Sequence, residues 1–152
     1  MKIKNFILVI TLILQLSCGY KLANNISDYK FKISDYELKG DKKVNNILER
    51  NFKRLQNPDD FSKIFKLNIN NTVNRTIMSK DTSGNALTYK LEVKVDIEVL
   101  NNENSINKIS FIEKTDYNNT DSKFELKQYE DILIQDLMDQ IIVKINNYLS
   151  SI

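Results

Sequence analysis

The side chains that proteins most often use for catalysis and metal binding are scarce in this sequence. It has no histidine and one cysteine, Cys18. This excludes histidine acid–base chemistry, a zinc site of Cys/His type, a Ser/His or Cys/His pair and a disulfide within the chain. The three glycines, at positions 19, 40 and 84, cannot form a Gly-rich phosphate loop. We therefore expect no metal, no cofactor and no enzymatic activity.

Carboxylates are the one remaining type of catalytic side chain. They are scattered along the sequence, and a pair such as Asp59 and Asp60 is interpreted as solvated loop residues. A carboxylate-based hydrolase stays open as an alternative, and it would require two acidic groups with separated pKa values in one cleft.

The balance of charge argues against a nucleic-acid partner. The 22 basic side chains include Lys2 and Lys4 of a removable leader, so 20 remain against 20 acidic side chains in the mature chain. Nucleic-acid binders neutralise several phosphates with clustered Lys and Arg, and this sequence has neither an excess nor a cluster.

Residues 1–17 have the three-part form of a secretory signal peptide. Lys2 and Lys4 precede an apolar run over residues 6–16, which is followed by the small residue Ser17. A membrane span needs about 20 apolar residues, so the run is too short to be one. The sequence therefore predicts that residues 1–17 are removed on export.

The junction at Ser17-Cys18-Gly19 resembles the lipobox of bacterial lipoproteins, although Gln15 stands where that motif usually has Leu. The resemblance implies that the sulfur of Cys18 carries diacylglycerol and that its new amine is acylated, with palmitate among the expected chains. Two or more chains anchor a protein stably. Gly19, in place of Asp, implies sorting to the outer membrane. The alternative, an ordinary secretory signal, would leave one unpaired thiol in an exported protein.

Residues 18–28 are expected to be a lipidated tether, and residues 29–152 a single α/β domain. Its hydrophobic pattern alternates where strands are expected and recurs every three or four residues where helices are expected. The cleanest alternation lies between Tyr89 and Val99. The expected elements are a strand over 29–38 with a bulge at 34–35, a helix from Asp41 to Gln56, strands over 65–77, 89–99 and 106–117, and a helix from Ser122 onward.

The last helix should carry an apolar stripe along its length, and Ser122 with Glu125 matches a capping box. We expect the stripe to comprise Phe124, Tyr129, Ile132, Leu133, Leu137, Ile141, Ile145, Tyr148 and Leu149. The order β-α-β-β-β-α predicts an α+β fold, with a four-stranded, mostly antiparallel sheet and two helices packed on one face.

This arrangement resembles the LptE family, lipopolysaccharide-assembly lipoproteins of the Gram-negative outer membrane. The resemblance spans the mature chain and rests on residues 18–22 (Cys-Gly-Tyr-Lys-Leu), 89–93 (Tyr-Lys-Leu-Glu-Val) and 129–131 (Tyr-Glu-Asp), with Ile132 and Leu137. It implies a non-catalytic plug and assembly partner of the LptD β-barrel, anchored in the periplasmic leaflet and contacting lipopolysaccharide.

Lipopolysaccharide carries phosphates, so basic residues near the second hairpin are the expected contacts: Arg75, Lys80 and Lys90. A solvated surface is the competing interpretation of each. A different class of function also stays open, in which a periplasm-facing lipoprotein binds another protein or an apolar ligand and has no link to lipopolysaccharide.

Substitution Cys18→Ala should abolish metabolic labelling with a radioactive fatty acid, because the acyl acceptor is removed. The protein should then be released or remain unprocessed. Labelling that persists in this variant would contradict the anchor assignment.

Overall fold

The computed structural model describes residues 29–56, 60–101 and 104–152. The predicted leader, Cys18 and the predicted tether, within residues 1–28, lie outside the described residues. The turn expected at 101–104 includes two residues, 102 and 103, that are also outside them.

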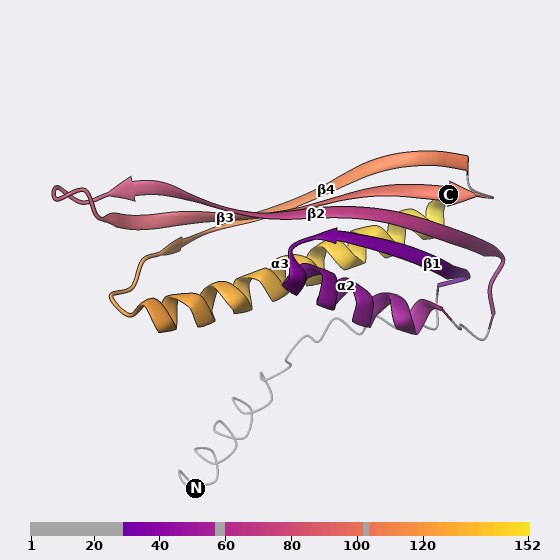
Figure 1. Ribbon diagram of the computed structural model, residues 1–152, viewed down its shortest axis with the longest axis horizontal. Coiled ribbons are helices and arrows are strands. Elements are labelled where there is room, and N and C mark those ends of the chain that lie inside the picture. The colour runs from indigo at the N-terminus through magenta and orange to yellow at the C-terminus, as the bar shows by residue number, and fades with distance from the viewer. Residues whose placement is uncertain (1–28, 57–59, 102–103) are drawn as a thin grey trace, which may run out of the picture.

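Four strands and two helices follow one another in the order β-α-β-β-β-α. Their bounds are β1 (Phe31–Gly40), α2 (Lys42–Leu55), β2 (Lys63–Lys80), β3 (Ala86–Asn101), β4 (Asn104–Asn118) and α3 (Lys123–Ser151). The sheet order is β1-β2-β3-β4, in which β1 pairs parallel to β2 and the other pairs are antiparallel. Both helices pack on one face (Figure 1). The expected fold class is confirmed.

Strand β3 shows why the sheet has one buried and one solvent-facing side. Its odd-numbered side chains from Leu91 to Val99 are at most 2% exposed, whereas the charged residues between them are only partly covered. Alternate strand residues point to opposite faces, so this pattern commits one face to the core. The bulge expected in β1 is also present, as a register shift between Ile33 and Asp35.

Helix α2 begins and ends where the sequence indicates. The Asp41 side chain accepts hydrogen bonds from the backbone N–H groups of Lys43 and Val44, at 2.8 and 3.1 Å, which satisfies donors that the first helical turn leaves unpaired. The helix ends at Leu55 with Gln56 as its C-cap. Its buried stripe is Val44, Ile47, Leu48, Phe52 and Leu55.

A buried asparagine holds β1, β2 and α2 together at the turn into α2. Asn71 is 1% exposed; it accepts a hydrogen bond from the Asp41 N–H at 2.9 Å and donates to Asn45 Oδ1 and the Lys39 carbonyl. Gly40 has φ +114, and a Cβ there would lie 1.9 Å from the Asn71 carbonyl oxygen. The turn therefore requires glycine both for its conformation and for its space.

The predicted stripe of α3 is wrong in the first half of the helix. Phe124, Tyr129 and Ile132 are 71, 45 and 58% exposed, while Leu126 and Ile134 are buried instead. Apolar residues surround this half of the helix, so their spacing could not identify the side that meets the sheet. In the second half the expected stripe is confirmed at Leu137, Ile141, Ile145 and Leu149.

Substitution Ile97→Asp should lower the free energy of unfolding by more than ~3 kcal/mol, because it places an unpaired charge in the packed face. Ile97 is 2% exposed. The matched control is Ile112→Asp on the solvent face, where the side chain is 48% exposed and the change should be about 0.5 kcal/mol or less. Chemical denaturation of both variants checks this, and equal stabilities would mean that the two faces are wrongly assigned.

Candidate functional site

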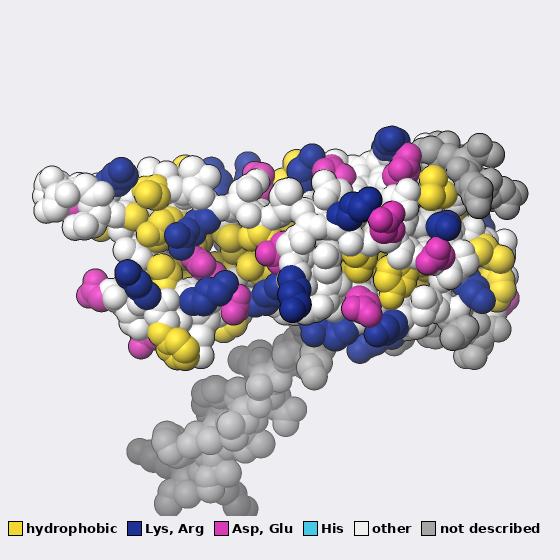
Figure 2. All heavy atoms as spheres, in the orientation of Figure 1, with side chains coloured by type: hydrophobic (Ala, Val, Ile, Leu, Met, Phe, Trp, Pro, Cys, Tyr) yellow, Lys and Arg dark blue, Asp and Glu magenta, His cyan; other side chains and the backbone are white. Residues whose placement is uncertain are grey.

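One hollow in the described part of the domain lies at the end where the β2–β3 hairpin extends past the start of α3; Figure 1 shows this arrangement of the hairpin and the helix. This hairpin-end cleft has a volume of about 750 Å³. Figure 2 shows hydrophobic and basic side chains exposed between the hairpin and the helix. The cleft is lined by Arg75, Asp81, Asn85, Ala86, Leu87, Tyr89, Asn119, Thr120, Asp121, Lys123, Leu126, Lys127 and Glu130.

Local hydrogen bonds fix both walls of the cleft. At the hairpin turn, Asp81 accepts from the backbone N–H groups of Ser83 and Asn85 at 2.9 and 2.8 Å. The Asn85 side chain also donates to it, and these hydrogen bonds hold the pKa of Asp81 below its usual range. Asn119, just before α3, donates from its backbone and side chain to the carbonyls of Leu87 and Ala86. The start of α3 is thereby tied to the hairpin.

A charged cluster of Arg75, Tyr117 and Glu130 lies at the inner end of the cleft. Glu130, on α3, is 9% exposed. Its Oε1 accepts from Arg75 Nη1 at 2.9 Å and from the Tyr117 hydroxyl at 2.5 Å. A buried carboxylate is costly unless it is paired and hydrogen-bonded, and these two donors supply both conditions. The three residues join β2, β4 and α3.

Aromatic rings complete the cluster. Tyr89 and Tyr117 stack at 5.5 Å between ring centroids, and Tyr129 meets Tyr117 edge-on at 6.0 Å. The Arg75 guanidinium lies 4.8 Å from the centroid of the Tyr89 ring, within range of a cation–π interaction. Apolar packing is thin at this end of the sheet, so the rings and the ion pair together hold the hairpin on α3.

The interactions within the cluster keep Arg75 positively charged and keep the hydroxyl of Tyr117 protonated. The hydrogen bond to Glu130 raises the pKa of Arg75, which stays protonated. Burial, followed by the hydrogen bond to Glu130 and the charge of that residue, raises the pKa of Tyr117 well above its usual value. Both donors to Glu130 therefore keep the protons that they share with its carboxylate.

The three basic residues that the sequence predicts as lipopolysaccharide contacts do not all lie together in the structure. Arg75 lies in the cleft and pairs with Glu130. Lys80 is exposed at the end of β2 beside the turn. Lys90 lies on the opposite face of the sheet, across from Thr76 and Asp116. The first two therefore share one end of the molecule, and the third belongs to a cross-strand charge ladder.

Glu130 was missed as a site residue because its partner is 55 positions away in the sequence. The only signal was its place among apolar residues in the stripe of α3, where a carboxylate needs a cationic partner.

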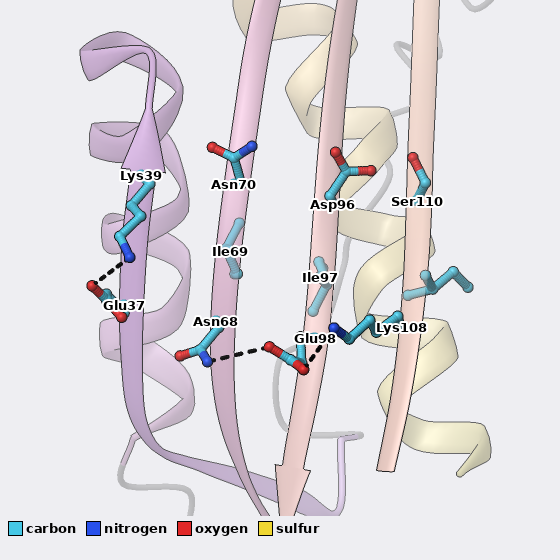
Figure 3. A pocket seen from close by; sticks show the side chains of 11 residues that line it. Glu37, Lys39, Asn68, Ile69, Asn70, Asp96, Ile97, Glu98, Lys108 and Ser110 are labelled. Atoms are coloured by element: carbon cyan, nitrogen blue, oxygen red, sulfur yellow. Dashed lines mark hydrogen bonds and ion pairs between the residues drawn. The ribbon is translucent and has the colours of Figure 1, made fainter. Parts of the chain in front are cut away.

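A second, shallower hollow of about 550 Å³ lies over the solvent face of the sheet (Figure 3). Polar side chains from all four strands line it: Glu37, Lys39, Asn68, Asn70, Asp96, Glu98, Lys108 and Ser110. Glu37 pairs with Lys39 at 3.0 Å and Glu98 with Lys108 at 3.1 Å. Partial burial acts to raise the pKa of Asp96, but hydrogen bonds from Lys94 and Ser110 outweigh it and lower the pKa.

The middle of the solvent face is therefore lined by polar side chains whose charges are compensated by neighbours, while Ile64 and Ile112 are exposed elsewhere on the same face. Among the described residues, no three His, Cys, Asp or Glu side chains are grouped so that they could hold a metal ion. Neither described helix is long and apolar enough to cross a membrane.

Comparison with known proteins finds similarity of fold without similarity of sequence. No family model and no curated protein sequence matches the chain. Among solved structures, an uncharacterised lipoprotein B from Nitrosomonas europaea superposes with a TM-score of 0.61 at 17% identity, over 88% of this chain and 91% of that one. The rare lipoprotein B of Shewanella oneidensis gives 0.57 at 15%, over 77 and 94%.

A minor lipoprotein from Acinetobacter baumannii gives a TM-score of 0.56 at 15% identity, over 81% of this chain and 92% of that one. At such identities the comparison concerns the fold alone. The common fold covers 91–94% of each of these three lipoproteins and 77–88% of this chain.

Substitution Tyr117→Phe should lower the free energy of unfolding by ~1–2 kcal/mol at pH 8, because it removes a buried hydrogen bond to a carboxylate. In the unfolded chain Tyr117 ionises near its ordinary pKa of 10.0, whereas the folded protein holds this proton to higher pH. Wild-type stability from this group is complete below pH ~10 and is lost as the pH rises above it. The difference between wild type and variant should therefore shrink above pH ~10.

Urea unfolding at several pH values measures this difference. Tyr129→Phe is the control from the same aromatic group, since the ring of Tyr129 is 45% exposed. A Tyr117→Phe penalty that stays constant through pH 11 would contradict the assignment.

Proposed function

We propose that this chain is a non-catalytic, lipid-anchored lipoprotein of the LptE family, which sits as a plug in an LptD-like outer-membrane barrel and takes part in lipopolysaccharide transport. Its lipid anchor would be Cys18, in the periplasmic leaflet. The observation that carries the proposal is one α+β architecture, common to this chain and to solved bacterial lipoproteins over nearly their whole length. The leader that ends at Cys18 supports the same assignment.

The length of the sheet supports a role inside a membrane barrel. Strand β2 has 18 residues, which at ~3.3 Å per residue extend over roughly 55–60 Å. A bilayer with its headgroups is about 40–45 Å thick. A domain of this length could extend along a barrel from the periplasmic leaflet to the opposite one.

The polarity of the sheet's solvent face supports it too. The interior of a large outer-membrane barrel is polar, and the charges that this face presents are largely paired within the face. Across β3 and β4, Glu98 lies opposite Lys108, Glu92 opposite Lys114 and Lys90 opposite Asp116. Such a face can lie against a polar wall without burying unpaired charge.

The hairpin-end cleft is the proposed contact for lipopolysaccharide. Ala86, Leu87 and Leu126 line it with apolar surface suited to acyl chains. Arg75 in the cleft, and Lys80 in the neighbouring hollow at the end of β2, offer cations suited to phosphate. The same cleft is also the observation that favours the second candidate function, in which a periplasm-facing lipoprotein binds an apolar ligand. That candidate requires no barrel.

Isolation of the full-length chain from its own cells in mild detergent separates the two functions. Under the proposal, a large outer-membrane barrel identified by mass spectrometry as an LptD homologue should co-purify in about equal amounts. Cys18→Ala should reduce this recovery, and Ser17→Ala, which keeps a small residue before the cysteine, is the matched control. Recovery of the wild-type chain without such a barrel would contradict the proposed function.

A further inference from the structure

The first half of α3 has two large apolar side chains on its outer side that stay mostly exposed. Phe124 and Ile132 are 71 and 58% exposed, whereas Tyr129 is 45% exposed and meets Tyr117 edge-on. The inner side of the same segment buries Leu126, Ile134 and Leu137. Large apolar side chains left exposed together mark interaction sites, and the described residues supply no second surface for these two.

The other sides of this segment face described parts of the chain. The inner side packs on the sheet, where Tyr117 and Arg75 hold Glu130. Lys123 and Lys127 line the hairpin-end cleft. On the side toward α2, Lys43 pairs with Asp131 at 2.8 Å.

The remaining side forms a ridge of exposed residues spaced four apart. At 100° per residue, Phe124, Gln128, Ile132 and Asp136 follow one another along it, and all four are exposed. Phe124 and Ile132 are eight residues apart, which places these two apolar anchors ~12 Å from each other along the helix axis. We call this surface the α3 ridge.

The exposed charges of α3 around the ridge are acidic, and Arg50 of α2 reaches its border by donating to Gln135 at 3.4 Å. Glu125, Asp136 and Asp139 are exposed on this outer side. From Phe124 to Val143 the only basic residue of the helix is Lys127, which lies in the cleft and reaches Asp131. Anionic lipid headgroups would repel such a surface. A partner with apolar pockets bordered by Lys or Arg would complement it.

We propose that the α3 ridge is the surface through which this chain docks on its protein partner, with Phe124 and Ile132 in apolar pockets rimmed by basic side chains. This inference rests on the proposed function, and the partner is the wall of the LptD-like barrel. Paired apolar anchors on one helix face are a common way for a helix to occupy a groove. Docking there would leave the hairpin-end cleft open.

Site-specific photo-crosslinking tests the docking surface. The full-length chain is co-expressed with the LptD homologue of its own cells, and p-benzoylphenylalanine replaces Ile132. The matched control places the same group at Arg54, an exposed residue of α2 that belongs neither to the α3 ridge nor to the solvent face of the sheet. We expect a crosslink to the barrel from position 132 at least tenfold stronger than from position 54.

A second measurement uses Ser variants. Ile132→Ser and Phe124→Ser should each weaken recovery of the barrel by roughly tenfold, because each removes a buried apolar side chain from the interface. Arg54→Ser, on the outer side of α2, should leave recovery unchanged. Circular dichroism of each variant verifies that the domain is folded.

The outcomes separate this inference from the proposed function. If the wild-type chain recovers the barrel but position 132 crosslinks no better than position 54, or crosslinks to lipid instead, the docking surface is wrong and the proposed function stands. If the wild-type chain recovers no barrel, the proposed function fails and this inference fails with it.

Discussion

The burial of one face of β3 is the constraint on which the rest of the structure depends. Five alternate side chains from Leu91 to Val99 are almost fully excluded from water. Their burial requires β2 and β4 on either side and helices beneath, since a sheet with one apolar face is stable only when that face is covered. The alternation of side chains leaves the charged residues of the same strand on the opposite face.

The helices cover this face unevenly, and the hairpin-end cleft lies where the cover ends. The β2–β3 hairpin extends past the first turn of α3 (Figure 1). At that end an ion pair and stacked tyrosines take the place of a continuous apolar core, with Glu130 holding both Arg75 and Tyr117. The cleft lies beside this cluster, and Arg75 and Glu130 line it. The residues that keep the hairpin in place therefore also form part of the cleft wall.

The solvent face of the sheet and the α3 ridge are surfaces of different kinds. On the solvent face, charges are compensated by neighbours, as in the pair formed by Glu98 and Lys108. On the α3 ridge, apolar side chains lie among acidic ones on a side that has no lysine. The first surface is suited to contact with a polar wall, and the second to a specific partner. A plug would need both, because it must fit its barrel and also be held in one orientation.

Local patterns in the sequence determined the elements of this protein and their caps. The period-two alternation of β3, the Asp41 cap of α2 and the bulge after Ile33 each depend on neighbouring residues, so they could be predicted. The sequence also predicted Arg75, Lys80 and Lys90 as contacts near the second hairpin. Arg75 and Lys80 do lie at the end with the cleft, whereas Lys90 lies on the other face of the sheet, as the alternation of β3 already indicates.

Only the tertiary structure decided which side of α3 is buried and which acidic side chain meets Arg75. Apolar residues surround the first half of α3, so its spacing is compatible with several buried sides, and only the position of the sheet selects one. Arg75 and Glu130 are 55 residues apart, and no local rule relates residues at that separation. Their pairing arises because β2 and α3 meet across the sheet's buried face, and that meeting is a property of the whole fold.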